Sequence, residues 1–75
     1  MYELIDFIVK SLVDNKEDVQ IEQVQEGKLT IFNVTVAQND MGQLIGKQGK
    51  MAEAIRTVVK AMDSRKPIRI KFNAK

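Results

Sequence analysis

The chain has 75 residues, no cysteine and 44% apolar residues. This composition excludes disulfides and thiolate metal sites, and it predicts a single small domain, residues 1–75, that folds by burial alone. Residues 1–40 hold three lysines against eight acids, whereas residues 41–75 hold nine lysines or arginines against two acids. A basic half favours a polyanionic partner, with simple solubilisation of the surface as the alternative.

Neither a membrane span nor a signal peptide is expected. No apolar stretch approaches the roughly 20 residues that cross a bilayer. The first residues carry acids within an amphipathic pattern, instead of a basic region followed by an apolar run. We therefore expect a cytoplasmic protein.

The first predicted element is a helix over residues 2–14, followed by a polar turn at residues 14–18. Phe7 falls off the apolar face of this helix, and we expect it to be half buried at the edge of that face rather than in contact with another chain. The apolar face itself consists of Leu4, Ile5, Ile8, Val9, Leu12 and Val13.

A β-hairpin follows this helix. Val19, Ile21 and Val24 lie in a run with Gln and Glu between them, as in a half-exposed strand, and residues 26–27 give a tight turn. Residues 29–36 are rich in β-branched side chains and form the second strand. The apolar alternation slips between Ile31 and Phe32, which indicates a central strand or a bulge, and we prefer the central strand.

Two helices flank a glycine loop in the next segment. Asp40, or Asn39 before it, is expected to cap a short helix over residues 41–45. The loop of residues 46–49 then leads into a helix from about Lys50 to Met62. The predicted core stripe of that helix is Met51, Ile55, Val58, Val59 and Met62.

Small residues form a second face of the long helix, namely Ala54, Thr57 and Ala61. This face is a candidate self-association surface, although small exposed residues also serve simply as helix formers. Pro67 ends the helical region, and residues 68–72 alternate as a last strand, with Ile68, Ile70 and Phe72 toward the core. The order α-β-β-α-α-β predicts an α+β fold, a three-stranded mixed sheet with helices on one face.

The loop itself has the chemistry of an anion site. Gly46 and Gly49 permit a sharp turn and a close approach of the backbone to a ligand, because they lack a Cβ. Lys47 and Gln48 lie between them. The loop opens a helix, so its unpaired N–H groups and the helix dipole suit a phosphate.

The stretch Leu44-Ile45-Gly46-Lys47-Gln48-Gly49-Lys50 resembles the GxxG signature of RNA-binding KH domains. The β-α-α-β unit around it, residues 29–73, and the helix and strand before it match the bacterial type II KH arrangement. The whole chain is similar to the small stand-alone bacterial KH proteins. That resemblance implies binding of single-stranded RNA, action as an RNA chaperone or post-transcriptional regulator, and pairing with a larger Jag-type KH protein in control of cell elongation and division.

The resemblance also implies roles for individual residues. Gly46 and Gly49 would let the backbone approach phosphates, Lys47 and Gln48 would contact the sugar-phosphate chain, and Lys50 would lie beside it. The apolar floor against which splayed bases pack would come from Leu44, Ile45 and Ile55. For Ile55, a place in the hydrophobic core is the preferred interpretation. Arg56 and Lys60, on the exposed side of the long helix, would add electrostatic contacts. Modest affinity, weak sequence preference and a marked salt dependence would follow.

Two other classes of function fit the sequence less well. The chain has no His and no Cys, and no metal-ligand spacing, so we expect no enzyme, no metal, no cofactor and no small-molecule substrate. The segment from Gly42 is one residue short of a Walker A loop and lacks its hydroxyl, which argues against a nucleotide hydrolase. The remaining alternative is a protein-interaction module that dimerises without binding RNA. Acidic loop residues would favour it, whereas this loop has Lys47 and Gln48.

Overall fold

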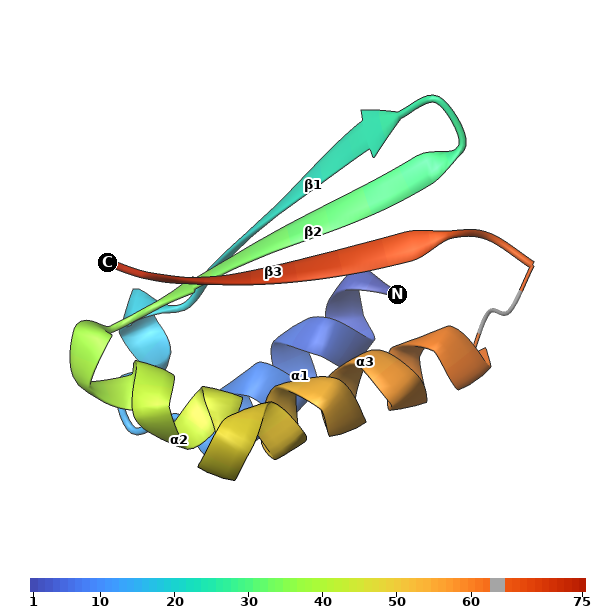
Figure 1. Ribbon diagram of the computed structural model, residues 1–75. Helices are drawn as coiled ribbons and strands as arrows, with labels where there is room; N and C mark the ends of the chain where they lie inside the picture. Colours follow the sequence, from blue (N-terminus) through green and yellow to red (C-terminus); the bar gives the residue numbers. More distant parts are fainter. Residues whose placement is uncertain (63–64) are drawn as a thin grey trace.

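The computed structural model describes residues 1–62 and 65–75, and within them the order α-β-β-α-α-β is confirmed (Figure 1). Three short 3₁₀ turns, Lys16–Asp18, Gln38–Asp40 and Lys47–Gly49, join some of these elements. The helices are α1 (Tyr2–Leu12), α2 (Met41–Ile45) and α3 (Lys50–Met62), and the strands are β1 (Gln20–Glu26), β2 (Leu29–Val36) and β3 (Ile68–Ala74).

The sheet has the order β1-β2-β3, with β1 antiparallel and β3 parallel to β2. The predicted central position of β2 is therefore confirmed, and its register with β1 runs unbroken from Gln20–Thr35 to Glu26–Leu29, so the slip in apolar alternation is not a bulge. Ile31 is only 5% exposed although it lies on the face opposite Phe32. Its cross-strand neighbours Val24 and Arg69 flank it on that face.

All three helices cover the same face of the sheet (Figure 1). The core lies between the two layers, because β2 presents its large apolar side chains to the apolar faces of α1 and α3. The last strand contributes Ile70, which is buried, and Ile68 and Phe72, which are partly buried against the core as predicted. The buried cluster comprises Ile5, Val9, Val13, Phe32, Val34, Val36, Leu44, Ile55, Val59 and Ile70.

Three expectations about these helices were wrong. Helix α1 ends at Leu12, two residues early, because Val13 adopts an extended conformation that turns its side chain into the core. Phe7 is 63% exposed, so the apolar face of α1 leaves it outside the core. In α3 the buried residues are Ala52, Ile55 and Val59. Met51, Val58 and Met62, which were expected in the core stripe, lie on an exposed flank.

Candidate functional site

The loop between α2 and α3 adopts a backbone that few residues other than glycine tolerate. Gly46, Gln48 and Gly49 all have positive φ, at 78°, 56° and 76°. A Cβ on Gly46 would lie 2.5 Å from the Cβ of Met51 and 2.9 Å from its backbone nitrogen. The first glycine is therefore required both by its dihedral angles and by the close passage of α3.

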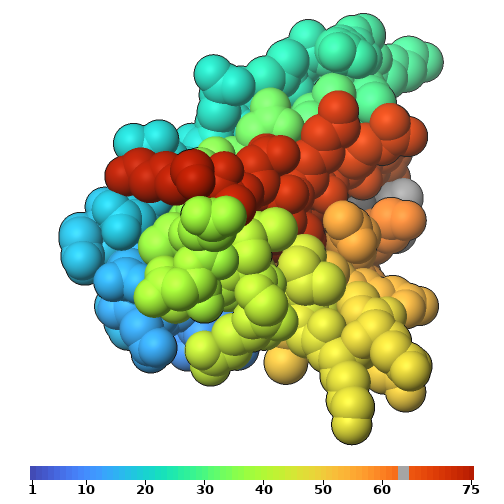
Figure 2. All heavy atoms as spheres, turned by 60° about the vertical axis from the view of Figure 1, so that its left-hand side comes forward, coloured from blue at the N-terminus to red at the C-terminus, as the bar shows by residue number. Residues whose placement is uncertain are grey.

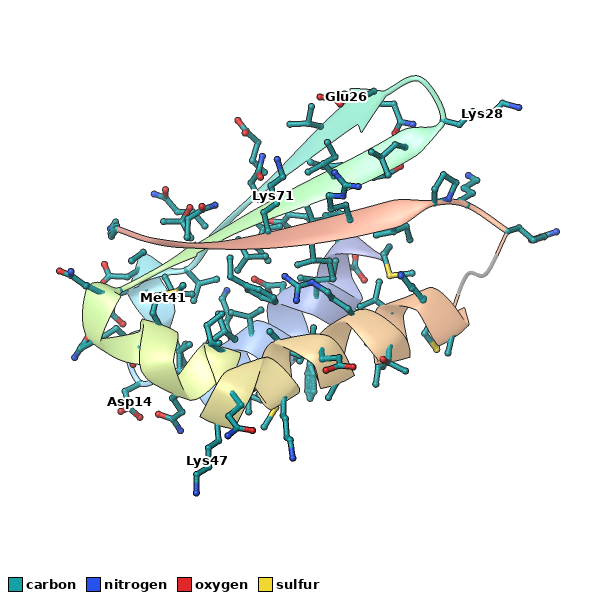
Figure 3. All side chains as sticks on the ribbon, viewed as in Figure 1. Asp14, Glu26, Lys28, Met41, Lys47 and Lys71 are labelled. Carbon is teal, nitrogen blue, oxygen red and sulfur yellow. The ribbon has the colours of Figure 1, made fainter. Side chains whose placement is uncertain are left out.

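The loop presents polar donors to solvent. Lys47 and Gln48 are exposed, and neither side chain has a hydrogen-bond or ion-pair partner among the described residues. Their backbone N–H groups likewise have no backbone acceptor in the described part of the chain. Lys47 points away from the body of the molecule (Figure 3), and the yellow segment that holds the loop and the start of α3 projects from the surface (Figure 2). This geometry suits an anion, because unpaired donors and the positive end of α3 meet at one place.

The apolar residues before the loop divide between core and surface. Leu44 is fully buried, so the expectation that it contacts a ligand does not fit this structure. Ile55 is 3% exposed, which confirms that it belongs to the core. Ile45 remains partly exposed beside Gly46. Of the three residues expected to form an apolar floor, Ile45 alone has the exposure that a direct contact needs.

Arg56 and Lys60 lie four residues apart on one side of α3 and are both exposed. Arg56 is not free, however, because its Nε and Nη2 donate to the carbonyl oxygen of Ile70 at 3.3 and 3.2 Å. Its guanidinium carbon also lies 5.3 Å from the ring centroid of Phe72. The structure therefore fixes Arg56 against β3, whereas Lys60 has no bonded partner in the described residues.

The start of α2 is held in place by hydrogen bonds to residues outside the helix. Asp40 is 2% exposed, and its carboxylate makes no capping bond to α2. Asp40 therefore occupies the N-cap position of α2, as predicted, but its side chain does not cap the helix. The side chain instead accepts hydrogen bonds from the backbone N–H groups of Asp14 and Asn15 and from the Asn15 side chain. The sequence offered no signal for this contact, because the partners lie 25 or more residues apart.

Burial acts to raise the pKa of the Asp40 carboxyl, but the hydrogen bonds from Asn15 and Asp14 and the nearby charge of Lys16 outweigh it and lower the pKa overall. The carboxylate is thus held in its charged form. It ties the turn after α1 to the helix that leads into the loop.

The small face of α3 is exposed at all three of its residues, Ala54, Thr57 and Ala61. The exposed apolar side chains of Met51, Val58 and Met62 border it along the same helix. We refer to these three residues as the apolar flank. It lies on the side of α3 away from Arg56 and Lys60, because the two sets are about half a turn apart around the helix axis.

A GxxG loop between two helices, carried on an α-β-β-α-α-β chain with a mixed sheet, defines a KH domain. The chain belongs to one particular group of such proteins, the KhpA/KhpB KH-domain family, whose sequence profile matches residues 2–73. The resemblance found in the sequence is thereby confirmed. No helix in the described residues combines the length and the apolar character needed to cross a membrane.

Several curated relatives carry the name RNA-binding protein KhpA. The one from Clostridium perfringens is 52% identical over 61 residues, which cover 81% of each chain. The relative from Borreliella burgdorferi is 48% identical over 79% of this chain and 72% of its own. The relative from Chlamydia trachomatis is 40% identical over 93% of this chain and 90% of its own. These proteins are named for RNA binding and not as enzymes, in agreement with the prediction that this chain is not an enzyme.

Proposed function

We propose that this protein binds single-stranded RNA through the loop of residues 46–49. The observation that carries the proposal is the projecting loop, in which unpaired N–H groups and Lys47 lie at the start of α3. Three curated relatives of similar length are named as RNA-binding proteins, which supports RNA as the polyanion.

Each loop residue has a part in this proposal. Gly46 and Gly49 keep the backbone open to a phosphate, while Lys47, Gln48 and Lys50 donate to the sugar-phosphate chain. Ile45 offers an apolar contact to a splayed base. Because most of these contacts go to the backbone of the RNA, we expect weak base preference and an affinity that falls steeply with salt.

We further propose that the protein acts in the cytoplasm as a homodimer or with a larger Jag-type KH protein. The exposed small face of α3 and the apolar flank beside it support a protein contact, since contiguous exposed apolar residues often mark one. Such a contact would leave the loop accessible. The expected outcome for the bound RNA is chaperoning or post-transcriptional regulation, with cell elongation and division as the process affected.

The alternative is a protein-interaction module without RNA binding. This alternative uses the same surface of α3 for the protein contact. It differs from the RNA-binding proposal only because it assigns no ligand to the loop. The exposed Lys47 and the absence of an acid between the glycines favour RNA, because an acidic side chain there would repel phosphates.

A titration of a fluorescent mixed-sequence RNA of about twelve nucleotides, at low and moderate salt, tests the proposal. The double variant Lys47→Asp, Gln48→Asp should lose binding while the domain stays folded, because both side chains are exposed and unpaired. The matched control is Lys28→Asp with Gln23→Asp, the same substitutions on exposed residues of the hairpin. Lys28 lies at the tip of the hairpin, far from Lys47 (Figure 3). Wild-type affinity in the loop variant would remove the loop from the mechanism, and no binding by the wild type would favour the interaction module.

A further inference from the structure

Strand β1 leaves one edge of the sheet unpaired. Only β2 pairs with it, in a register that runs unbroken over all seven residues of β1. Hydrogen-bonding groups alternate along an antiparallel strand, so every second residue of β1 turns its N–H and C=O toward the free edge. No backbone hydrogen bond between the described residues reaches these groups. They are therefore open to pairing with a further strand.

The usual devices that block a free edge are missing from β1. Natural sheets protect their edges with proline, lysine, bulges or a covering helix. Residues 20–26 contain no proline and no lysine, and their pairing with β2 has no bulge. Gln23 and Gln25 lie on the helix side of the sheet, because they pair with Phe32 and Thr30, and yet both are exposed. The helices therefore leave this edge uncovered (Figure 1).

The opposite edge of the sheet is protected. Strand β3 exposes Arg69 and Lys71 at alternate positions, and long cationic side chains disfavour pairing with another strand. The carbonyl oxygen of Ile70 already accepts two hydrogen bonds from Arg56. Among the strands of the described residues, β1 therefore has the edge that is open to a partner.

The open edge is acidic. Glu22 and Glu26 lie on the face of the sheet away from the helices, since they pair with Asn33 and Leu29. The side-chain amide of Asn33 donates to Glu22 across this face at 3.5 Å. Both glutamates are exposed, and β1 contains no cationic residue. The two carboxylates are four residues apart, so a strand beside β1 could match them with Lys or Arg at the same spacing.

We propose that the free edge of β1 binds an extended segment of a partner protein, which adds a fourth strand and places Lys or Arg opposite Glu22 and Glu26. Backbone hydrogen bonds supply the affinity, and the two glutamates select a cationic segment. A second copy of β1 fits this edge less well, because edge-to-edge pairing gathers four carboxylates on one face. RNA is disfavoured there too, since the carboxylates repel phosphates.

This edge is separate from the loop that is proposed to bind RNA. Glu26 and Lys47 lie on opposite sides of the molecule in Figure 3. Residues 1–40, which include β1, carry the acidic excess of the chain, and residues 41–75, which include the loop, carry the basic excess. The inference therefore does not depend on RNA binding, and a partner strand at β1 leaves the loop accessible.

Two capped, fluorescent peptides test whether a strand is added. The first alternates lysine and valine over seven residues, the length of β1. The second has the same sequence with every backbone nitrogen methylated, which keeps the charge but removes the N–H donors. Fluorescence anisotropy should show binding of the first peptide and binding at least about tenfold weaker for the second, because main-chain hydrogen bonds are lost. Equal binding of the two peptides, or no binding of the first, would overturn the proposal.

The selection of cations is tested by Glu22→Lys with Glu26→Lys. This variant should bind the unmethylated peptide at least about tenfold more weakly, since two attractive cross-strand pairs become repulsive. It should stay folded, because both side chains are exposed. Glu3→Lys with Glu53→Lys is the matched control, with the same change of charge at exposed residues of α1 and α3, and it should bind like the wild type. Equal affinities of the two double variants would contradict a role for the β1 glutamates.

Amide hydrogen exchange, followed by NMR, locates the bound peptide. Alternate amide protons of β1, those that face the free edge, should exchange more slowly when the unmethylated peptide is bound, whereas those of β3 should not change. Protection confined to β3 or to a helix would rule out the β1 edge as the binding site. Protection of β1 that grows with protein concentration in the absence of peptide would instead assign the edge to a second copy of the chain.

Discussion

The carboxylate of Asp40 accepts a hydrogen bond from the backbone N–H of Asn15 and a second from the Asn15 side-chain amide, both at 3.0 Å. The N–H of Asp14 donates a third at 3.2 Å. Asn15 follows α1, and Asp40 directly precedes α2. These bonds therefore fix the helix that carries the loop relative to the first helix, and they do so from beneath the surface.

We expect Asp40→Asn to lower the melting temperature by several degrees. The substitution keeps the shape of the side chain but puts an NH₂ group where an N–H needs an acceptor. Thermal unfolding followed by circular dichroism measures the effect. Asp14→Asn is the matched control, because the Asp14 side chain is exposed and only its backbone N–H takes part. Equal melting temperatures for the two variants would mean that the Asp40 carboxylate does not hold the helices together.

Stability should also fall in acid because of this carboxylate. The pKa of Asp40 is lowered in the folded protein from its ordinary value of 3.8. A lowered pKa contributes stability that is fully present above the unfolded value and is lost as the pH falls through the folded value. Urea unfolding of the wild type and of Asp40→Asn between pH 2 and 6 should show a difference that is constant above about pH 5 and shrinks below pH 4. A difference that does not vary with pH would contradict this assignment.

The two loop glycines should differ in their tolerance of a methyl group. Gly49→Ala should cost about 1–2 kcal/mol, because its positive φ is unfavourable for alanine but no atom lies within 4 Å of the new Cβ. Gly46→Ala should cost more, since its Cβ would also collide with Met51. Urea unfolding of both variants gives the comparison. Equal costs would show that α3 shifts easily away from the loop.

The sequence predicted the three α-helices and the three strands of the described residues, because apolar periodicity and turn residues act locally, but it did not predict the short 3₁₀ turns. The apolar periodicity of the sequence did not predict correctly which face of α3 is turned toward the core. Met51, Val58 and Met62 are more apolar than Ala52, yet Ala52 faces the core, where a small side chain fits. Pairings distant in sequence were also hidden, such as that of Arg56 with Ile70 across α3 and β3. Contacts of this kind depend on how helices and strands pack against one another, and they produce no periodic pattern in the sequence.

Leu44 and Ile45 should separate stability from binding. Leu44→Ala should destabilise the domain by about 2–5 kcal/mol, since it leaves a cavity in the core. Ile45→Ala should cost much less stability, because the side chain is only partly buried, but it should weaken RNA binding. Urea unfolding and RNA titration of both variants measure the two effects. Unchanged RNA affinity in Ile45→Ala would exclude this residue as a base contact.

Self-association, if it uses the small face of α3, should be sensitive to side-chain size at Ala54. We expect Ala54→Arg to shift the protein to a monomer, because a long side chain prevents close approach of a second helix. The domain should stay folded, since Ala54 is exposed and arginine is a good helix former. Sedimentation equilibrium measures the mass of each variant in solution.

Glu53→Arg is the matched control for this experiment, because Glu53 is the adjacent exposed residue and lies toward the side of α3 that carries Lys60. It should keep the oligomeric state of the wild type. If Ala54→Arg still dimerises, the small face is not the interface, and Val58→Arg then tests the neighbouring apolar flank. Val58 is 48% exposed, so its replacement should leave the core intact while removing the one β-branched side chain of that flank. A dimer that survives both substitutions would place the interface away from α3.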